Sequence, residues 1–468
     1  MDMTRNNLKN TGIERRKVFI SFLGTNDYVS TYYHYGKNKS PKPVRFIQEA
    51  LIGMFCSDWT ANDHIYIFRT KKARDLNWVN FGQEYNKTAI GLETTLENMH
   101  LVVPYEEKEI PEGFSEEELW GIFNSIFECI LENDDLYVDV THAFRSIPMF
   151  STILFNYTKM IKSTETKAIY YGAFEIMGTK KEVLAIPEEE RDAPILDLSK
   201  FVYLQNITNA ANNFVNSGNL RSTAEILKQI EFNLESGKKS ISHKDKLSYA
   251  LSSFSDELDT CRGTIIKSGK TVKTIKAQIG NMLKYDIPSP IEEVLRRILE
   301  KMNKFKDESD LDNVVEAVWW CSKNGMMQQA YTLAEEYIIT IVTDILLSTT
   351  KISSLIQADD EKKKKKDERE FCSSVIGMND LQVQDPNNWF GIIRKEEYKD
   401  SVLQILDFPW IKELRKPYGK LLANRNDLNH GGFLDNKTPD VFIKDKNFKQ
   451  PFETCLEILA EEKKRNGI

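Results

Sequence analysis

The sequence is poor in the features that mark secreted, membrane-spanning and strongly basic proteins. Its six cysteines are scattered over 468 residues without a C-x-x-C pair, so neither a zinc site nor a disulfide framework is indicated. No stretch approaches about 18 consecutive apolar residues, so we expect no membrane-spanning helix. The net charge of -7, from 63 basic and 70 acidic residues, argues against a globally basic nucleic-acid binder but is compatible with a local basic groove.

Signals for targeting and for common cofactors are also missing. The first ten residues, MDMTRNNLKN, contain no hydrophobic segment, so we expect no secretory signal and a reduced, cytoplasmic setting. No G-x-G-x-x-G follows the first expected strand and no P-loop is present, which disfavours a generic nucleotide-cofactor enzyme. We expect neither a metal nor a cofactor. Hydrophobic residues at 41% still predict a folded chain.

The first 175 or so residues alternate between strand and helix patterns. Because strands that alternate with helices favour a mainly parallel sheet, we expect an α/β, Rossmann-like N-terminal domain with ligands at the carboxyl ends of its strands. A capping-box signature, with Glu118 three residues after Ser115, marks one helix start. The expected strands are 17–24, 64–70, 100–105, 135–141 and 167–174, and the expected helices are 44–55, 115–132 and 148–161.

Beyond about residue 190 the strand signal fades and an all-α region is expected. The segment 324–347 is the strongest helical pattern, whereas the lysine run in 361–370 predicts a solvated loop or mobile segment. We therefore divide the chain into an N-terminal sensing domain at 1–190, a helical linker region at 191–310 and a C-terminal helical domain at 311–468. No internal repeat is apparent.

Two strand ends carry polar residues suited to ligand binding. The first strand runs into Gly24-Thr25-Asn26, where glycine permits a tight turn and a close approach of a ligand to the backbone. The strand at 135–141 runs into Thr141 and His142, with Arg145 shortly before the next helix. An arginine beside a helix N-terminus suits an anion such as phosphate. Ordinary capping of the two turns is the alternative reading.

A second constellation lies near the C-terminus, in the run RNDLNH. Arg425 would stabilise charge on a phosphate, His430 would move protons, and Asn426 would position the phosphate or the histidine. A spacing of five residues turns the two side chains about 140° apart on a helix, so they would not meet on one face. Either the helix ends at His430 beside the following glycines, or two copies of the motif converge across a two-fold axis. The alternative interpretation is purely structural, with a histidine that caps the helix and an arginine on the surface.

These motifs together resemble a known family. SFLGTN, DVTHAFRS and KAIYYGAFE resemble the CARF domains of CRISPR-associated proteins, in the subgroup marked by a D-x-T-H-G motif. RNDLNH resembles the R-x-x-x-x-H motif of HEPN ribonucleases. In this order they resemble the stand-alone CARF–HEPN ribonucleases of type III CRISPR systems, over about residues 16–180 and 320–435.

The resemblance implies an antiviral, metal-independent endoribonuclease that cuts single-stranded RNA. A cyclic oligoadenylate, with cyclic tetra-adenylate preferred, would bind the CARF domains of a homodimer or higher homo-oligomer. This allosteric activator would switch on a composite HEPN site that leaves a 2′,3′-cyclic phosphate. Ala143 departs from the family glycine, which leaves the details of ligand fit open. By position in the motifs, the implied ligand-binding residues are Gly24, Thr25, Asn26, Thr141, His142 and Arg145, and the implied catalytic residues are Arg425, Asn426 and His430.

Two other interpretations stay open at this stage. The chain could be a non-catalytic regulator or scaffold that senses the cyclic oligoadenylate. Alternatively, the N-terminal domain could itself cleave its ligand, with Thr25, Asn26 or His142 assisting attack by an adenylate 2′-hydroxyl.

Overall fold

The computed structural model describes residues 15–80, 90–142, 147–229, 238–285, 287, 289–431, 433 and 449–467. The chain forms two compact units, Met1–Gln205 and Asn206–Ile468. The boundary between them falls inside one helix, α7 (Ser199–Ser217). The proposed three-part division at residues 190 and 310 stays a prediction.

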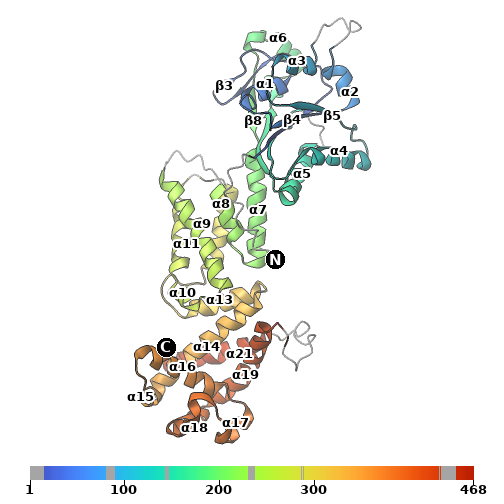
Figure 1. The fold of residues 1–468 in the computed structure, drawn as a ribbon. Coiled ribbons are helices and arrows are strands. Elements are labelled where there is room, and N and C mark those ends of the chain that lie inside the picture. Colours follow the sequence, from blue (N-terminus) through green and yellow to red (C-terminus); the bar gives the residue numbers. More distant parts are fainter. Residues whose placement is uncertain are drawn as a thin grey trace. The chain divides into compact units, whose positions relative to one another are not determined.

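The N-terminal unit is built on an eight-stranded sheet with the order β3-β2-β8-β7-β6-β1-β4-β5 (Figure 1). Five of its seven pairings are parallel, and β7–β8 and β2–β3 are antiparallel. The expected α/β, mainly parallel sheet is therefore confirmed, in the form of a mixed sheet. The strands are β1 (Lys17–Leu23), β2 (Tyr32–Tyr35), β3 (Asn38–Lys39), β4 (His64–Arg69), β5 (Tyr105–Glu109), β6 (Asp135–Asp139), β7 (Glu165–Gly172) and β8 (Asp192–Asp197).

The residues of β1 show why this sheet is buried on both faces. Successive side chains of a strand point to opposite sides. Phe19 accordingly joins a core with α1 and α3, whereas Val18 and Ile20 join a second core with α4 and α5. Figure 1 shows these helix pairs on opposite sides of the sheet. The helices are α1 (Ile47–Phe55), α2 (Lys71–Ala73), α3 (Leu92–Asn98), α4 (Glu116–Cys129), α5 (Ile147–Lys162) and α6 (Lys180–Ala185).

The expected cap of α4 is present in a modified form. Ser115 accepts a hydrogen bond from the Glu118 N–H at 3.2 Å. The Glu118 carboxylate accepts from the N–H of Phe114, one residue before the cap, at 2.8 Å. This pairing fixes where the chain enters α4.

The sheet differs from the sequence-based expectation both at an edge and in its interior. The strand expected at 100–105 lies instead at Tyr105–Glu109, with the sequence YEEKE. An edge strand commonly carries charges, which discourage pairing with other chains. A prediction based on apolar residues therefore selects the neighbouring segment 100–105 instead of β5. Inside the sheet, between β2 and β7, the strand β8 was also missed, because Pro194 interrupts its pattern.

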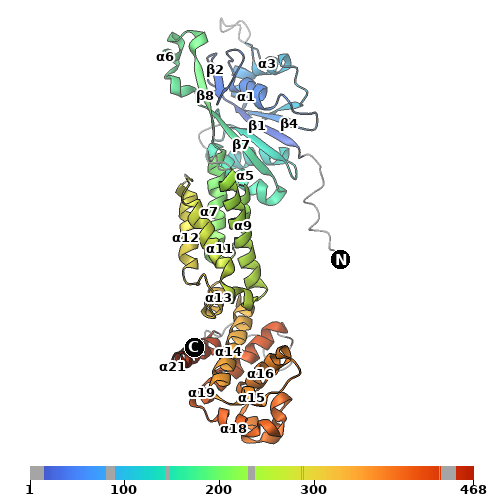
Figure 2. The ribbon, with the colours of Figure 1, turned by 90° about the vertical axis from the view of Figure 1, so that its left-hand side faces the viewer.

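The C-terminal unit is helical, as expected (Figure 2). Its buried apolar side chains form one continuous hydrophobic core. The pattern at 324–347 is confirmed by α14, whose buried face includes Tyr331 and Ile338. In the described part of the chain, no helix combines the length and apolar content needed to cross a membrane. The remaining helices are α8 (Arg221–Gln229), α9 (Lys238–Asp259), α10 (Gly263–Ser268), α11 (Lys270–Met282), α12 (Ser289–Met302), α13 (Asp312–Lys323), α14 (Met327–Thr349), α15 (Ile352–Leu355), α16 (Glu361–Ile376), α17 (Asp380–Gln384), α18 (Lys399–Leu406), α19 (Pro409–Asn429) and α21 (Gln450–Asn466).

The loop predicted at 361–370 is wrong, because this segment is the first part of α16. Asp360 caps the helix by accepting a hydrogen bond from the Lys363 N–H at 2.7 Å. Lysine is a good helix former, and Lys363 also pairs with Asp359 four residues earlier. The lysines cover the solvated start of a helix whose last turns bury Phe371 and Cys372.

Candidate functional site

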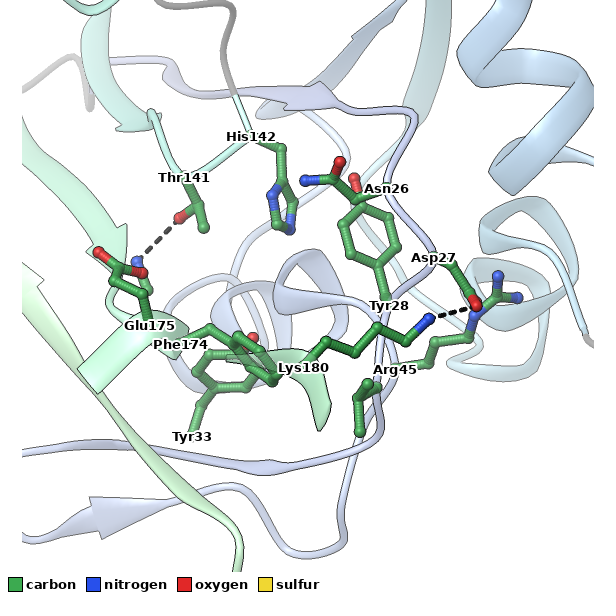
Figure 3. A pocket seen from close by; sticks show the side chains of 12 residues that line it. Asn26, Asp27, Tyr28, Tyr33, Arg45, Thr141, His142, Phe174, Glu175 and Lys180 are labelled. Carbon is green, nitrogen blue, oxygen red and sulfur yellow. Dashed lines mark hydrogen bonds and ion pairs between the residues drawn. The ribbon is translucent and has the colours of Figure 1, made fainter. Parts of the chain in front are cut away.

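A cavity of about 430 Å³ lies in the N-terminal unit, next to the ends of β1 and β6 (Figure 3). The chain adds β4 and β5 on one side of β1 and β6 and β7 on the other. Neighbouring loops diverge at such a switch point, which leaves a crevice where ligands bind. The lining residues are Asn26, Asp27, Tyr28, Val29, Tyr33, Arg45, Thr141, His142, Gly172, Phe174, Glu175 and Lys180.

A buried carboxylate organises the end of β6. The parallel register pairs Ile20 with Val138, and one further step sets Ser21 beside Asp139. The Ser21 hydroxyl donates to Asp139 at 2.6 Å, and Thr141 donates through its N–H at 2.9 Å and its hydroxyl at 2.5 Å. Burial raises the pKa of Asp139, and these hydrogen bonds oppose the shift. Asp139 therefore fixes the turn that presents Thr141.

Thr141 also joins β6 to β7 at the cavity wall. Its hydroxyl oxygen accepts a hydrogen bond from the N–H of Gly172 at 2.8 Å, as drawn in Figure 3. The Thr141 hydroxyl thus donates to Asp139 and accepts from Gly172 at the same time. The hydroxyl donor and one of its two acceptor positions are therefore used for structure, as is the Thr141 N–H.

The end of β1 is held by Tyr28. The Gly24 N–H donates to the Tyr28 hydroxyl oxygen at 2.9 Å, and the Tyr28 ring lies 4.3 Å from the His142 ring, measured between centroids. A β-carbon at Gly24 would lie 2.8 Å from that hydroxyl oxygen and 3.2 Å from the β-carbon of His142. Glycine is therefore required for this close approach of the two loops. Asn77 holds the outer part of the same turn, since its amide donates to the carbonyls of Gly24 and Asn26, each at 2.9 Å.

His142 is uncharged in this setting. Enclosure of its ring by protein lowers the pKa to about 4, because the charged form loses its hydration. A neutral imidazole carries one N–H donor and one nitrogen acceptor. His142 is therefore suited to hydrogen bonding with a sugar or base, or to accepting a proton, rather than to pairing with phosphate as a cation.

Charged residues at the cavity were missed by the sequence analysis. Lys180, at the first turn of α6, pairs with Asp27 in the loop after β1 at 2.5 Å. Arg45 donates to the side-chain oxygen of Asn77 at 3.0 Å, and burial lowers the pKa of its guanidinium. Glu175 accepts a hydrogen bond from the Tyr171 hydroxyl. Lys180 and Arg45 follow no strand directly, so no motif marked them. The lining therefore holds two cations, Arg45 and Lys180, and two carboxylates, Asp27 and Glu175, and Lys180 is already paired with Asp27.

The structure brings together three of the six predicted ligand residues. Asn26, Thr141 and His142 line the cavity, and Gly24 lies behind Tyr28. Thr25 is not among the lining residues. Arg145 and Ala143 lie outside the described residues.

The second constellation lies at the end of α19 in the C-terminal unit. Asn429 is the last residue of the helix and His430 is its C-cap, so the expected helix end at His430 is present. Gly431 follows with φ +60°, a backbone angle that favours glycine. His430 and Asn426 are exposed, and the Arg425 side chain is 31% exposed.

The Arg425 side chain is held by two neighbours. Its Nε lies 2.8 Å from Oε2 of Glu335 on α14, and its Nη1 donates to Asn426 at 3.1 Å. No hydrogen bond within the described part of the chain joins Arg425 to His430. The same residues contain no group of three or more His, Cys, Asp or Glu that could hold a metal ion. An arginine and an exposed histidine thus lie near one helix end.

Comparison with known proteins gives a distant relative. No family model matches the chain. Over 227 residues, the chain is 25% identical to CRISPR-associated protein MJ1674 from Methanocaldococcus jannaschii. The match covers 48% of this chain and 32% of that protein, so the chain spans about a third of the length of its relative.

Proposed function

We propose that this protein is a CRISPR-associated endoribonuclease activated by a cyclic oligoadenylate. The ligand would occupy the cavity at the ends of β1 and β6, as in a CARF domain, and the C-terminal unit would act as a HEPN ribonuclease. The observation that carries the proposal is the meeting of Asn26, Thr141 and His142, from two separate sequence motifs, in one cavity. Similarity to an archaeal CRISPR-associated protein supports the biological setting.

The cavity offers the contacts that an adenylate requires. Aromatic side chains at Tyr28, Tyr33 and Phe174 suit a base, and Arg45 and Lys180 suit phosphate. Because a ring of adenylates has rotational symmetry, two copies of this cavity in a homodimer or higher homo-oligomer would bind equivalent parts of it. Cyclic tetra-adenylate is the preferred ring.

The C-terminal motif supplies the groups that are needed to cleave RNA without a metal. The RNA 2′-hydroxyl attacks the adjacent phosphorus, the 5′-oxygen leaves, and the products are a 2′,3′-cyclic phosphate and a 5′-hydroxyl. Arg425 would stabilise the charge that develops on the phosphate, and His430 would transfer a proton. Asn426 would position Arg425, which it contacts through its side-chain oxygen. Copies of the motif from two subunits would form one composite site.

The test is cleavage of labelled single-stranded RNA in EDTA, with rings of three to six adenylates. We expect one ring to stimulate cleavage and the products to carry cyclic phosphate ends. His430→Ala should abolish the stimulation, and Arg425→Gln should lower the stimulated rate strongly but leave it measurable. Arg415→Gln is the matched control, because Arg415 lies on the same helix and also pairs with a carboxylate, that of Asp380. Failure of every ring, or full activity of His430→Ala, would refute the nuclease.

A ligand-sensing regulator without nuclease activity is the alternative, because the cavity could bind a ring whether or not the C-terminal unit cuts RNA. Calorimetry would separate the two functions: ring binding without RNA cleavage under any condition would select the regulator. Chromatography of the same ring after long incubation tests whether the N-terminal unit also cleaves its ligand. An uncharged His142 is able to accept a proton from an adenylate 2′-hydroxyl, which favours cleavage of the ring. Recovery of an intact ring would exclude this cleavage.

A further inference from the structure

Helices α14 and α19 are joined by a row of polar contacts that ends at Arg425. The contributing residues of α14 are spaced three and four apart, so they lie on one face of the helix. Each contacts a side chain in the last turns of α19. The three pairs are Gln328–Asn429 at 3.1 Å, Tyr331–Asn424 at 2.9 Å and Glu335–Arg425 at 2.8 Å.

The last pair differs from the others because it is ionic and shielded. Glu335 Oε2 and Arg425 Nε are both inaccessible to water, and the Glu335 side chain is only 11% exposed. Neither atom has a hydrogen-bond partner in the described part of the chain, so their 2.8 Å contact is an ion pair held by charge. Burial raises the pKa of Glu335, whereas Arg425 opposes the shift. Burying a carboxylate costs desolvation free energy, and attraction to an oppositely charged partner offsets part of it. Helix packing alone would be served as well by an apolar pair.

The contact leaves part of Arg425 available. Glu335 engages Nε, the inner nitrogen of the guanidinium, while Nη1 contacts Asn426. The side chain as a whole keeps 31% exposure although Nε has none, so water reaches other atoms of the same group. The fork of a guanidinium binds phosphate through its outer nitrogens. A carboxylate fixed at Nε therefore limits rotation of the side chain without occupying all of its donors.

We propose that Glu335 is a positioning residue, which holds the Arg425 guanidinium ready for the scissile phosphate of RNA. This inference rests on the proposed ribonuclease function and adds a residue that no motif marked. Glu335 does not touch the substrate and acts through Arg425 alone. Tyr331 supports the arrangement by holding Asn424, the residue before Arg425, in the buried part of α19.

The test compares Glu335→Gln with Glu336→Gln. Glu336 is the next residue of α14, is 58% exposed, and pairs with Arg369 at 2.7 Å rather than with the RNDLNH run. Glutamine keeps the length of the side chain and removes its charge. We expect Glu335→Gln to lower kcat for RNA cleavage by about tenfold with little change in KM, since an oriented charge acts mainly in the transition state. Glu336→Gln should retain the wild-type kcat.

A double-mutant cycle separates positioning from a purely structural role. In an Arg425→Gln background, Glu335→Gln should cause no further loss of kcat, because its only route to the substrate is gone. An additive loss would overturn the proposal, as would a kcat equal to that of Glu336→Gln. A higher kcat for Glu335→Gln would also overturn it, because the ion pair would then hold Arg425 away from its productive position. If the wild type cuts no RNA with any ring, the proposed function fails first; if it cuts and Glu335→Gln is normal, only this inference fails.

Discussion

Replacing Thr141 by valine removes a hydroxyl group and little else, because both side chains are β-branched and similar in shape. Two hydrogen bonds disappear: the one donated to Asp139 at 2.5 Å and the one accepted from the Gly172 N–H at 2.8 Å. At about 1 kcal/mol for each, the variant should lose about 2 kcal/mol of local stability. Loss of the second bond leaves the Gly172 amide, at the end of β7, without its partner.

Hydrogen exchange followed by mass spectrometry measures this loss in the N-terminal unit alone. A change of about 2 kcal/mol corresponds to exchange that is about 30-fold faster in peptides from β6 and β7. Thr141→Ser keeps the hydroxyl and is the matched control, with exchange close to wild type. Exchange in Thr141→Val that equals the wild type, or equal acceleration in both variants, would refute the assigned role of the hydroxyl.

Two further predictions concern the same cavity. Gly24→Ala should weaken binding of cyclic tetra-adenylate by about tenfold in calorimetry, because its β-carbon displaces the Tyr28 hydroxyl and crowds His142; unchanged affinity would contradict the close packing of the two loops. The pKa of His142, about 4 in the folded protein and ordinarily about 6.5, should make the N-terminal unit lose stability as the pH falls from about 6.5 to about 4, because the unfolded chain binds the proton first. His142→Gln should remove part of this pH dependence, and hydrogen exchange measured across that range checks the difference.

The four neighbouring strands β7, β6, β1 and β4 could be predicted because their signals are local. The nearly continuous apolar run KVFISFL, for example, is typical of a strand that is buried on both faces of a parallel sheet. The edge strand β5 and the proline-containing β8 were not predictable in this way, since their charged or broken patterns depend on neighbours far away in sequence. The loop predicted at the lysine-rich start of α16 was wrong for the same reason, because this helix is stabilised by the buried residues that follow.

The candidate site was predictable only in part. Residues directly after a buried strand, such as Asn26 and Thr141, could be placed at the sheet edge from chain order alone. Lys180 and Arg45 could not, because they enter the cavity from α6 and from the segment before α1. Glu335 lies 90 positions before Arg425 in the sequence, and only the packing of α14 on α19 brings the two charges together.

The link between the two units is tested most directly by titrating cyclic tetra-adenylate into the wild type, Gly24→Ala and His430→Ala while RNA cleavage is measured. The proposed mechanism predicts that Gly24→Ala needs more ring to reach the wild-type rate, because only its affinity is reduced. His430→Ala should bind the ring normally and cut no RNA at any concentration. A rate that does not respond to the ring in the wild type, or wild-type cleavage by His430→Ala, would contradict a sensor in the N-terminal unit that controls a nuclease in the C-terminal unit.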